Sequence, residues 1–295
     1  MPIQQEQDRV VLQHPKGPSA EILFYGATVI SWKAPSPGRS EPIERLFVSS
    51  KSALDGSKPV RGGIPVVFPC FGAPTHPEHL KLPQHGFARN STWKYIGPVM
   101  DNEAGVSVRL ALEPTPAIKE KYDHPFELAY VVTLAEHQLS TDLHVKNTAL
   151  STTGPLEFQA LLHTYIRAPS SEVTVEPLHG VTYYDKTEAT EELKAQPKVE
   201  NRPAVDVKKF TDYVYENAPG KYTVAWPGGE IEIKTKNFPN VVVWNPQAEA
   251  GSKIGDMEDR GWEKYICVEP GYVRGFRKLD AGETWVGQQV LTVVQ

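Results

Sequence analysis

The chain has few cysteines, little excess charge and no long apolar run. Its two cysteines, Cys70 and Cys267, lie far apart and form no CxxC pair, so neither a disulfide framework nor a thiolate zinc site is indicated. The formal net charge of −5 argues against a nucleic-acid-binding surface. No stretch approaches the ~18 apolar residues of a membrane span, and the polar first ten residues lack the apolar core of a signal peptide. We therefore expect a cytoplasmic protein without nucleic-acid or membrane partners.

Several motifs of known enzyme classes are also missing. The sequence contains no GxxxxGK[ST] phosphate-binding loop and no HxH or HExxH histidine pair. It shows no alternation of strands and helices, which argues against a parallel nucleotide-binding sheet. It has no repeat of fixed period, which argues against a propeller or a solenoid. The missing ligand motifs predict a site without a metal ion.

Period-two alternation of apolar and polar residues recurs along the chain and indicates a fold made of strands. The 26 prolines and 22 glycines favour many turns and few long helices. We predict strands at residues 20–25, 106–112, 127–135, 139–145, 222–226, 231–235, 241–244 and 285–294. Short helical segments are predicted only at residues 50–54 and 115–122, because neighbouring prolines limit any extension of the second.

The most polar segment, residues 186–209, interrupts the chain about two thirds along. The strands on both sides of it have the same character, and no change of composition marks a second fold. We therefore predict an all-β, large antiparallel sandwich formed by residues 1–295 as one domain, with this segment as a long surface loop.

Two loops combine side chains that could bind an anionic sugar. In residues 55–69, a glycine-rich turn carries Lys58 and Arg61 and leads into a buried strand. In residues 82–90, Gln84, His85 and Arg89 stand within six residues, and their amide, imidazole and guanidinium groups suit sugar hydroxyls or a phosphate. Each loop is also compatible with a purely structural role, as a solvated turn or as a loop whose side chains cap its own backbone.

One histidine and one glutamate are candidates for proton transfer. His163 lies in an otherwise apolar and aromatic strand, and an imidazole is a natural proton donor near neutral pH. Glu269 ends an apolar strand before a Pro-Gly turn, where partial burial would raise its pKa towards that of a useful general base. A satisfied core histidine and a carboxylate that braces the turn are the structural alternatives.

Taken together, five segments resemble the glucose-6-phosphate 1-epimerases, also called hexose-6-phosphate mutarotases, of the aldose 1-epimerase superfamily. The resemblance rests on residues 55–68, 82–93, 158–167, 243–246 and 266–271, in the order of that family. It implies a β-supersandwich like that of galactose mutarotase, with the active site on a concave face, no cofactor and a sugar phosphate as the substrate, chiefly glucose 6-phosphate. We expect a monomer.

The resemblance also implies the roles of individual residues. His163 resembles the general acid and Glu269 the general base that exchange α and β anomers by opening and closing the sugar ring. The matching substrate-binding positions are Arg61, Gln84, His85, Arg89 and Asp212, of which Asp212 is the weakest match. Tyr272 departs from the pattern, because the family usually has a histidine after this Glu-Pro-Gly turn.

Three other functions remain open on the sequence alone. The first is a mutarotase of unphosphorylated aldoses, against which the two arginines argue, because neutral sugars need no pair of guanidinium groups. The second is a carbohydrate-binding protein without catalysis. The third is a glycosidase that uses Glu269 and Asp212, which would require the two carboxylates to flank one glycosidic bond.

Overall fold

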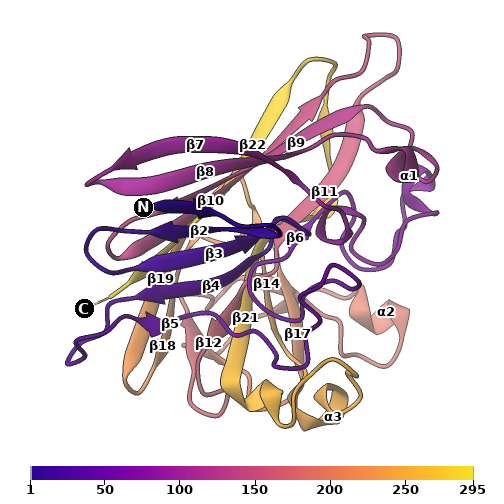
Figure 1. The fold of residues 1–295 in the computed structure, drawn as a ribbon. Coiled ribbons are helices and arrows are strands. Elements are labelled where there is room, and N and C mark those ends of the chain that lie inside the picture. The colour runs from indigo at the N-terminus through magenta and orange to yellow at the C-terminus, as the bar shows by residue number, and fades with distance from the viewer. Residues whose placement is uncertain (1, 295) are drawn as a thin grey trace.

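The computed structural model describes residues 2–294 as three antiparallel sheets joined by turns and short helices (Figure 1). The N-terminal sheet has five strands in chain order, β1 (Ile3–Gln5), β2 (Arg9–Gln13), β3 (Ser19–Leu23), β4 (Val29–Ala34) and β5 (Ile43–Glu44). These strands, indigo in Figure 1, lie across the front of the molecule. The structure therefore confirms the predicted all-β class, although it has a third, smaller sheet beside the two large ones.

The largest sheet has nine strands. In spatial order they are β16 (Val205–Asp206), β13 (Thr174–Glu176), β18 (Lys221–Trp226), β19 (Gly229–Lys236), β22 (Thr284–Val293), β10 (Gln138–Asn147), β9 (Phe126–Leu134), β8 (Gly105–Leu112) and β7 (Lys94–Asn102). The other large sheet has eight strands. Seven follow one path, β15 (Lys198–Val199), β14 (Thr182–Asp185), β17 (Thr211–Tyr215), β20 (Asn240–Asn245), β21 (Tyr265–Leu279), β11 (Leu156–Leu162) and β6 (Val66–Val67), and β12 (Tyr165–Arg167) pairs with β21.

Helices are few and short. The α-helices are α1 (Pro116–Lys119), α2 (Glu191–Lys194) and α3 (Gln247–Gly251), and the 3-10 helices are η1 (Pro77–His79), η2 (Ala88–Asn90) and η3 (Gly261–Lys264). Helix α1 lies inside the helical segment predicted at residues 115–122, with the Thr115 side chain capping its first turn. None of the described helices is long and apolar enough to cross a membrane.

All eight predicted strands coincide with observed strands, but the helix predicted at residues 50–54 is absent. The backbone there forms a turn in which Ser49 Oγ accepts a hydrogen bond from the Lys51 N–H. Ser52 Oγ accepts another from the Arg61 N–H, 2.8 Å away. Serine side chains that bind nearby backbone groups favour turns over helices, which explains why this prediction is wrong.

The polar segment at residues 186–209 is not one long loop, as predicted. It contains α2 and the two short strands β15 and β16, which pair with β14 and β13 at the edges of different large sheets. Because edge strands offer unpaired backbone groups, even two-residue segments can extend them. The polar composition of the whole segment concealed this pairing, because a strand of two residues is too short to show an alternating pattern, even though Val205 is buried.

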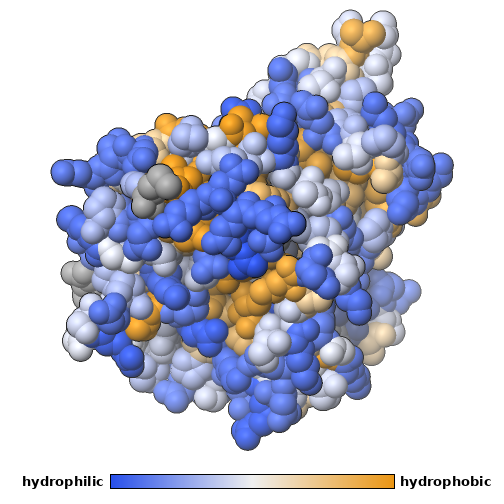
Figure 2. Space-filling model, in the orientation of Figure 1, coloured by the Kyte–Doolittle hydropathy of each residue, from blue (hydrophilic) through white to orange (hydrophobic). Residues whose placement is uncertain are grey.

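A large apolar core joins the three sheets. It contains Leu12 of the first sheet, Val108 of the nine-stranded sheet and Val241 and Val243 of the eight-stranded sheet. The prediction of a single domain stays a prediction, although a core shared by all three sheets is what it requires. On the face shown in Figure 2, apolar side chains form patches between hydrophilic ones.

Strand β20 is buried on both of its faces, but only one of these faces belongs to the large core. Val241 and Val243 point into the large core, whereas Val242 and Trp244 point to the opposite face of the eight-stranded sheet. This second face carries the cavity described next.

Candidate active site

A cavity of about 180 Å³ lies on this second face of the eight-stranded sheet. The residues that line it come from the sheet and from the loops that precede and follow β6. They are Arg61, Phe71, Gln84, His85, Arg89, His163, Lys186, Asp212, Val242, Trp244 and Glu269. All seven site residues predicted from the sequence are therefore brought together, although their roles stay predictions. Lys58 is exposed and does not line the cavity.

The register of three adjacent strands places the sheet residues of the site. Asp212 of β17 pairs with Trp244 of β20, and Val242 of β20 pairs with Glu269 of β21. Because alternate residues of a strand share a face, all four side chains point to the cavity side. The sequence match for Asp212 was weak, yet its register places it in the cavity.

His163 lies opposite Glu269, in a short break between β11 and β12. The pairs Leu161–Gly271 and Tyr165–Cys267 bracket the two residues. The expected continuous strand is interrupted at His163, whose backbone N–H instead donates to the Pro65 carbonyl at 3.0 Å. The break turns the imidazole towards the cavity, where its ring stacks on Tyr165 at a centroid distance of 4.8 Å and an angle of 11°.

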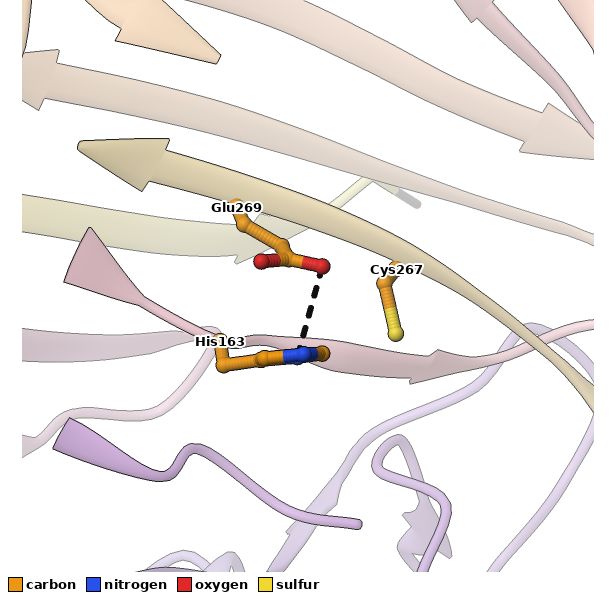
Figure 3. A group of neighbouring side chains, drawn as sticks. All are labelled: His163, Cys267 and Glu269. Atoms are coloured by element: carbon orange, nitrogen blue, oxygen red, sulfur yellow. Dashed lines mark ion pairs between the residues drawn. The ribbon is translucent and has the colours of Figure 1, made fainter. Parts of the chain in front are cut away.

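His163 and Glu269 form a close, buried pair (Figure 3). His163 Nδ1 lies 3.3 Å from Glu269 Oε1, and the side chains are 11% and 2% exposed. Neither His163 Nδ1 nor Glu269 Oε2 has a hydrogen-bond partner among the described residues. Buried polar atoms are rarely left without partners, so these two atoms are available to a ligand.

Burial shifts the pKa values of the pair in opposite directions. It lowers the pKa of His163 well below its usual value, and the nearby His85 and Arg89 lower it further. Burial raises the pKa of Glu269 well above its usual value, and the Asp212 carboxyl raises it further. A neutral imidazole beside a carboxylic acid holds the same number of protons as an imidazolium beside a carboxylate. The second arrangement sets an acid and a base side by side, which is what acid–base catalysis requires.

A sharp turn brings the second imidazole to the cavity. Gly86 has a φ of +72°, and a side chain there would place its Cβ 2.1 Å from the Phe68 carbonyl oxygen, so only glycine fits. Nδ1 of the adjacent His85 accepts a hydrogen bond from the Gly72 N–H at 3.1 Å. Burial lowers the pKa of His85 well below its usual value, so the ring is neutral, and its Nε2 lies 3.3 Å from the side-chain nitrogen of Gln84.

Three cations line the cavity. Arg61 Nε donates to Asp256 at 3.0 Å. Although burial opposes it, Tyr165 and Asp256 raise the pKa of Arg61 above its usual value. Arg89 donates to the Gln84 carbonyl at 3.0 Å, but its buried Nε has no hydrogen-bond partner among the described residues. The third cation, Lys186, has its Nζ 4.5 Å from the centre of the Phe71 ring and forms no ion pair within residues 2–294.

Sequence reasoning missed Lys186, Phe71, Val242 and Trp244 as cavity residues. Trp244 belonged to a recognised segment, so its presence there was a usable signal. Lys186 gave none, because it stands at the start of the polar segment interpreted as a loop. Its backbone N–H donates to the Asp212 carbonyl at 2.8 Å, and this strand contact brings it to the cavity. Tyr272, by contrast, lines a separate groove with Trp285.

The described residues contain one group of three possible metal ligands, His163, Cys267 and Glu269, all of them buried. His163 and Glu269 are the acid–base candidates, and Cys267 lies beside them without lining the cavity. Both cysteines are free and buried.

Comparison with known proteins agrees with this arrangement. Residues 8–292 match the model of the family described as Aldose 1-epimerase. A protein of Cenchrus ciliaris named "Putative glucose-6-phosphate 1-epimerase" is 33% identical over 97% of this chain and 85% of its own length. A protein of Escherichia coli K12 with the same name is 28% identical over 93% of this chain and 86% of its own.

Solved structures have the same fold. A crystal structure from Salmonella typhimurium, described as "a putative mutarotase", superposes with a TM-score of 0.84 at 25% identity, covering 99% of this chain and 93% of that chain. A galactose 1-epimerase from Lactobacillus acidophilus superposes with a TM-score of 0.72 at 15% identity, covering 99% of this chain and 97% of the other. The fold is thus that of the galactose mutarotases, and the chain belongs to the aldose 1-epimerase family.

Proposed function

We propose that this protein interconverts the α and β anomers of hexose 6-phosphates, glucose 6-phosphate above all. The observation that carries the proposal is that three cations, Arg61, Arg89 and Lys186, line the same cavity as the His163–Glu269 pair. A neutral aldose has no group that needs three cations, whereas a phosphate accepts several charge-assisted hydrogen bonds. The names of the relatives from Cenchrus ciliaris and Escherichia coli support the same substrate class.

The proposed reaction uses only the proton held by the acid–base pair. Glu269 as carboxylate removes the proton from O1, the C1–O5 bond breaks as O1 forms the aldehyde, and His163 protonates the ring oxygen O5. The C1–C2 bond then rotates, and O5 attacks the other face of the aldehyde. O5 returns its proton to His163, and Glu269 returns its proton to O1, so the enzyme is unchanged.

The geometry of the pair suits two oxygens bound to the same carbon. Because O1 and O5 are both attached to C1, the acid and the base must stand next to each other. His163 Nδ1 and Glu269 Oε1 are 3.3 Å apart. Each proton transfer contributes about 10²–10⁴-fold to the rate. The neutral His85 is placed to donate to a sugar oxygen, and the Asp212 carboxyl to bind sugar hydroxyls.

The decisive experiment is exchange NMR on the anomeric protons of glucose 6-phosphate and of glucose, with and without catalytic amounts of protein. We expect kcat/KM to be at least about 100-fold higher for the phosphorylated sugar, since each charge-assisted hydrogen bond contributes about 1.5–3 kcal/mol. A Glu269→Gln protein serves as the control for trace contaminating activity.

Two outcomes would contradict the proposal. Equal acceleration of both sugars would indicate a mutarotase of unphosphorylated aldoses. Sugar phosphate binding without faster exchange would indicate a carbohydrate-binding protein. The expected cytoplasmic location and monomeric state belong to the proposal as well, and light scattering of the purified protein tests the second.

A further inference from the structure

The group of His163, Cys267 and Glu269 has the composition of a zinc site although the sequence has no zinc motif. Each residue offers one ligand atom, and the three atoms lie within 4.8 Å of one another. A nitrogen, a sulfur and an oxygen ligand with a fourth position left open is an arrangement that Zn²⁺ accepts. Figure 3 shows the three side chains turned towards one another, with Cys267 and Glu269 both on β21.

The spacing of the nitrogen and oxygen fits tetrahedral coordination. Zinc bonds of about 2.0–2.2 Å to a nitrogen and an oxygen put those two atoms roughly 3.3–3.5 Å apart in a tetrahedron. His163 Nδ1 and Glu269 Oε1 are 3.3 Å apart. A Zn–S bond of about 2.3 Å asks the Cys267 sulfur to lie roughly 3.5 Å from each of them. In the structure all three ligand atoms lie within 4.8 Å of one another, at most about 1.3 Å more than this tetrahedral spacing.

A second observation points to a ligand at the same two side chains. His163 Nδ1 and Glu269 Oε2 are buried without hydrogen-bond partners among the described residues. Both side chains line the cavity, which gives an ion access from solvent. The fourth, open position then faces the cavity, where a water can complete the tetrahedron.

The charges around the site determine how unfavourable it is to bury a zinc ion there. A thiolate and a carboxylate neutralise the two charges of Zn²⁺, and two protons are released to solvent on binding, one from the Cys267 thiol and one held by the His163–Glu269 pair. The nearby Arg61, Arg89 and Lys186 oppose a cation, whereas the Asp212 carboxyl on the same cavity favours it. The site therefore does not require a net positive charge to be buried.

We propose that His163, Cys267 and Glu269 bind one Zn²⁺ ion, which occupies the acid–base pair and inhibits the enzyme. The inhibition rests on the proposed function, but the binding does not. Because zinc uses the atoms that would transfer protons, metal and sugar exclude each other. Substitution of Cys267 distinguishes metal binding from sugar binding, since Cys267 ligates the metal but does not line the sugar cavity.

The first test uses Co²⁺ as a spectroscopic substitute for Zn²⁺. We expect the chelator-treated wild-type protein to bind one equivalent of Co²⁺ with a near-ultraviolet thiolate-to-metal absorption band, and Zn²⁺ to abolish this band. Cys267→Ala and Cys267→Ser should lose the band. Their zinc affinity, measured against a chromophoric chelator, should fall by more than the ~10–100-fold that loss of a mere supporting partner of a ligand costs. Cys70→Ala is the matched control, because Cys70 is also buried and free.

The second test measures anomer exchange in the presence of Zn²⁺. Zinc should slow exchange by the wild type and by Cys70→Ala, and excess chelator should restore it, while Cys267→Ala stays active and insensitive. Absence of the Co²⁺ band in the wild type, or an unchanged zinc affinity in both folded Cys267 variants, would overturn the inference. If the chain is no epimerase, the band still appears, so the two proposals fail separately.

Discussion

Glu200 and Glu269 are almost equally buried, at 2% and 1% exposure, but their surroundings differ. Glu200 accepts hydrogen bonds from the Arg202 side chain and backbone and, at 2.7 Å, from the Tyr215 hydroxyl. Glu269 faces the His163 imidazole, and its Oε2 has no partner among the described residues. The two carboxyl groups are thus buried to almost the same extent, but the fold supplies more hydrogen-bond donors to Glu200 than to Glu269.

The two carboxyl groups consequently have opposite pKa shifts. Burial by itself raises the pKa of each. At Glu200 the bonds from Arg202 and Tyr215 outweigh burial and hold the pKa at about 2. At Glu269 the Asp212 carboxyl adds to the effect of burial, and the pKa is raised well above its usual value. A carboxylate whose donors all come from the fold is structural, while one left without donors is available for a substrate.

The comparison is tested most severely by removing the charge at Glu269. We expect Glu269→Gln to lower kcat by two or more orders of magnitude, because the base is lost while size and shape are kept. His163→Asn should have an effect of similar size. Anomer exchange by NMR measures both, and circular dichroism checks that they fold. Near wild-type exchange by a folded Glu269→Gln protein would contradict the assignment.

The same substitution at Glu200 should affect stability instead. The lowering of its pKa from 4.5 to about 2 corresponds to on the order of 3 kcal/mol of stabilisation by the ionised form. We expect Glu200→Gln to reduce the free energy of unfolding by about that amount at pH 7 and to leave kcat within about twofold. Urea unfolding and exchange NMR are the measurements. A larger loss of activity than of stability would place Glu200 in the site.

The pH dependence of stability should have opposite signs at the two positions. Because the folded pKa of Glu200 is depressed, its contribution is present above pH 4.5 and is lost as pH falls towards about 2. Because the folded pKa of Glu269 is raised, its ionisation destabilises the fold increasingly above pH 4.5. Melting curves between pH 4 and 8 should therefore show Glu269→Gln equal to or more stable than the wild type at the upper end. A destabilised Glu269→Gln protein at pH 8 would mean that its carboxylate is satisfied after all.

The arginines should separate the phosphorylated from the neutral sugar. We expect Arg61→Ala and Arg89→Ala to lower kcat/KM for glucose 6-phosphate by about 10- to 100-fold and to change the activity on glucose little. The loss of kcat/KM should be larger for Arg89→Ala than for Arg61→Ala. Arg61 is already paired with Asp256, whereas Arg89 Nε is unpaired among the described residues. Equal losses on both sugars would indicate that the arginines only support their loops.

Lys186 should contribute a smaller part of the same selectivity. It is half-buried, as Arg61 and Arg89 are, but its ammonium group is a point charge that lacks the two-pronged fork of a guanidinium. A contribution of about 1 kcal/mol corresponds to roughly fivefold in kcat/KM for glucose 6-phosphate. Lys186→Met removes the charge beside Phe71 and keeps a side chain of similar length, and Lys58→Met, at an exposed lysine that does not line the cavity, is its control. An equal effect of both variants would mean that only the general field of the protein acts on the substrate.

The smallest expected effect is that of removing metal ions. Catalysis by the pair alone needs none, so dialysis against a chelator should leave the rate on glucose 6-phosphate unchanged. Loss of activity that a divalent ion restores would refute this prediction.

Much of the fold could be read from the chain because period-two patterning is a local property. The strands around Val241 and Leu139 were predicted from it, and the five recognised segments contain every predicted site residue except Asp212. Local patterning failed at Ser49 and Ser52, where side chains compete for the backbone, and at β15 and β16, which are too short to show an alternating pattern.

What the sequence determined by itself was which chemical groups are present and on which face of a strand each would lie. Only the tertiary structure decided which of them meet. His163 stands opposite Glu269 because β11 and β12 pair with β21 on either side of a break, and Lys186 reaches the cavity through its backbone contact with Asp212. The same pairing puts Cys267 beside the acid and the base. The physical reason is that the burial of each glutamate and the groups that face it depend on how the strands pair, so the opposite pKa shifts of Glu200 and Glu269 exist only in the folded chain.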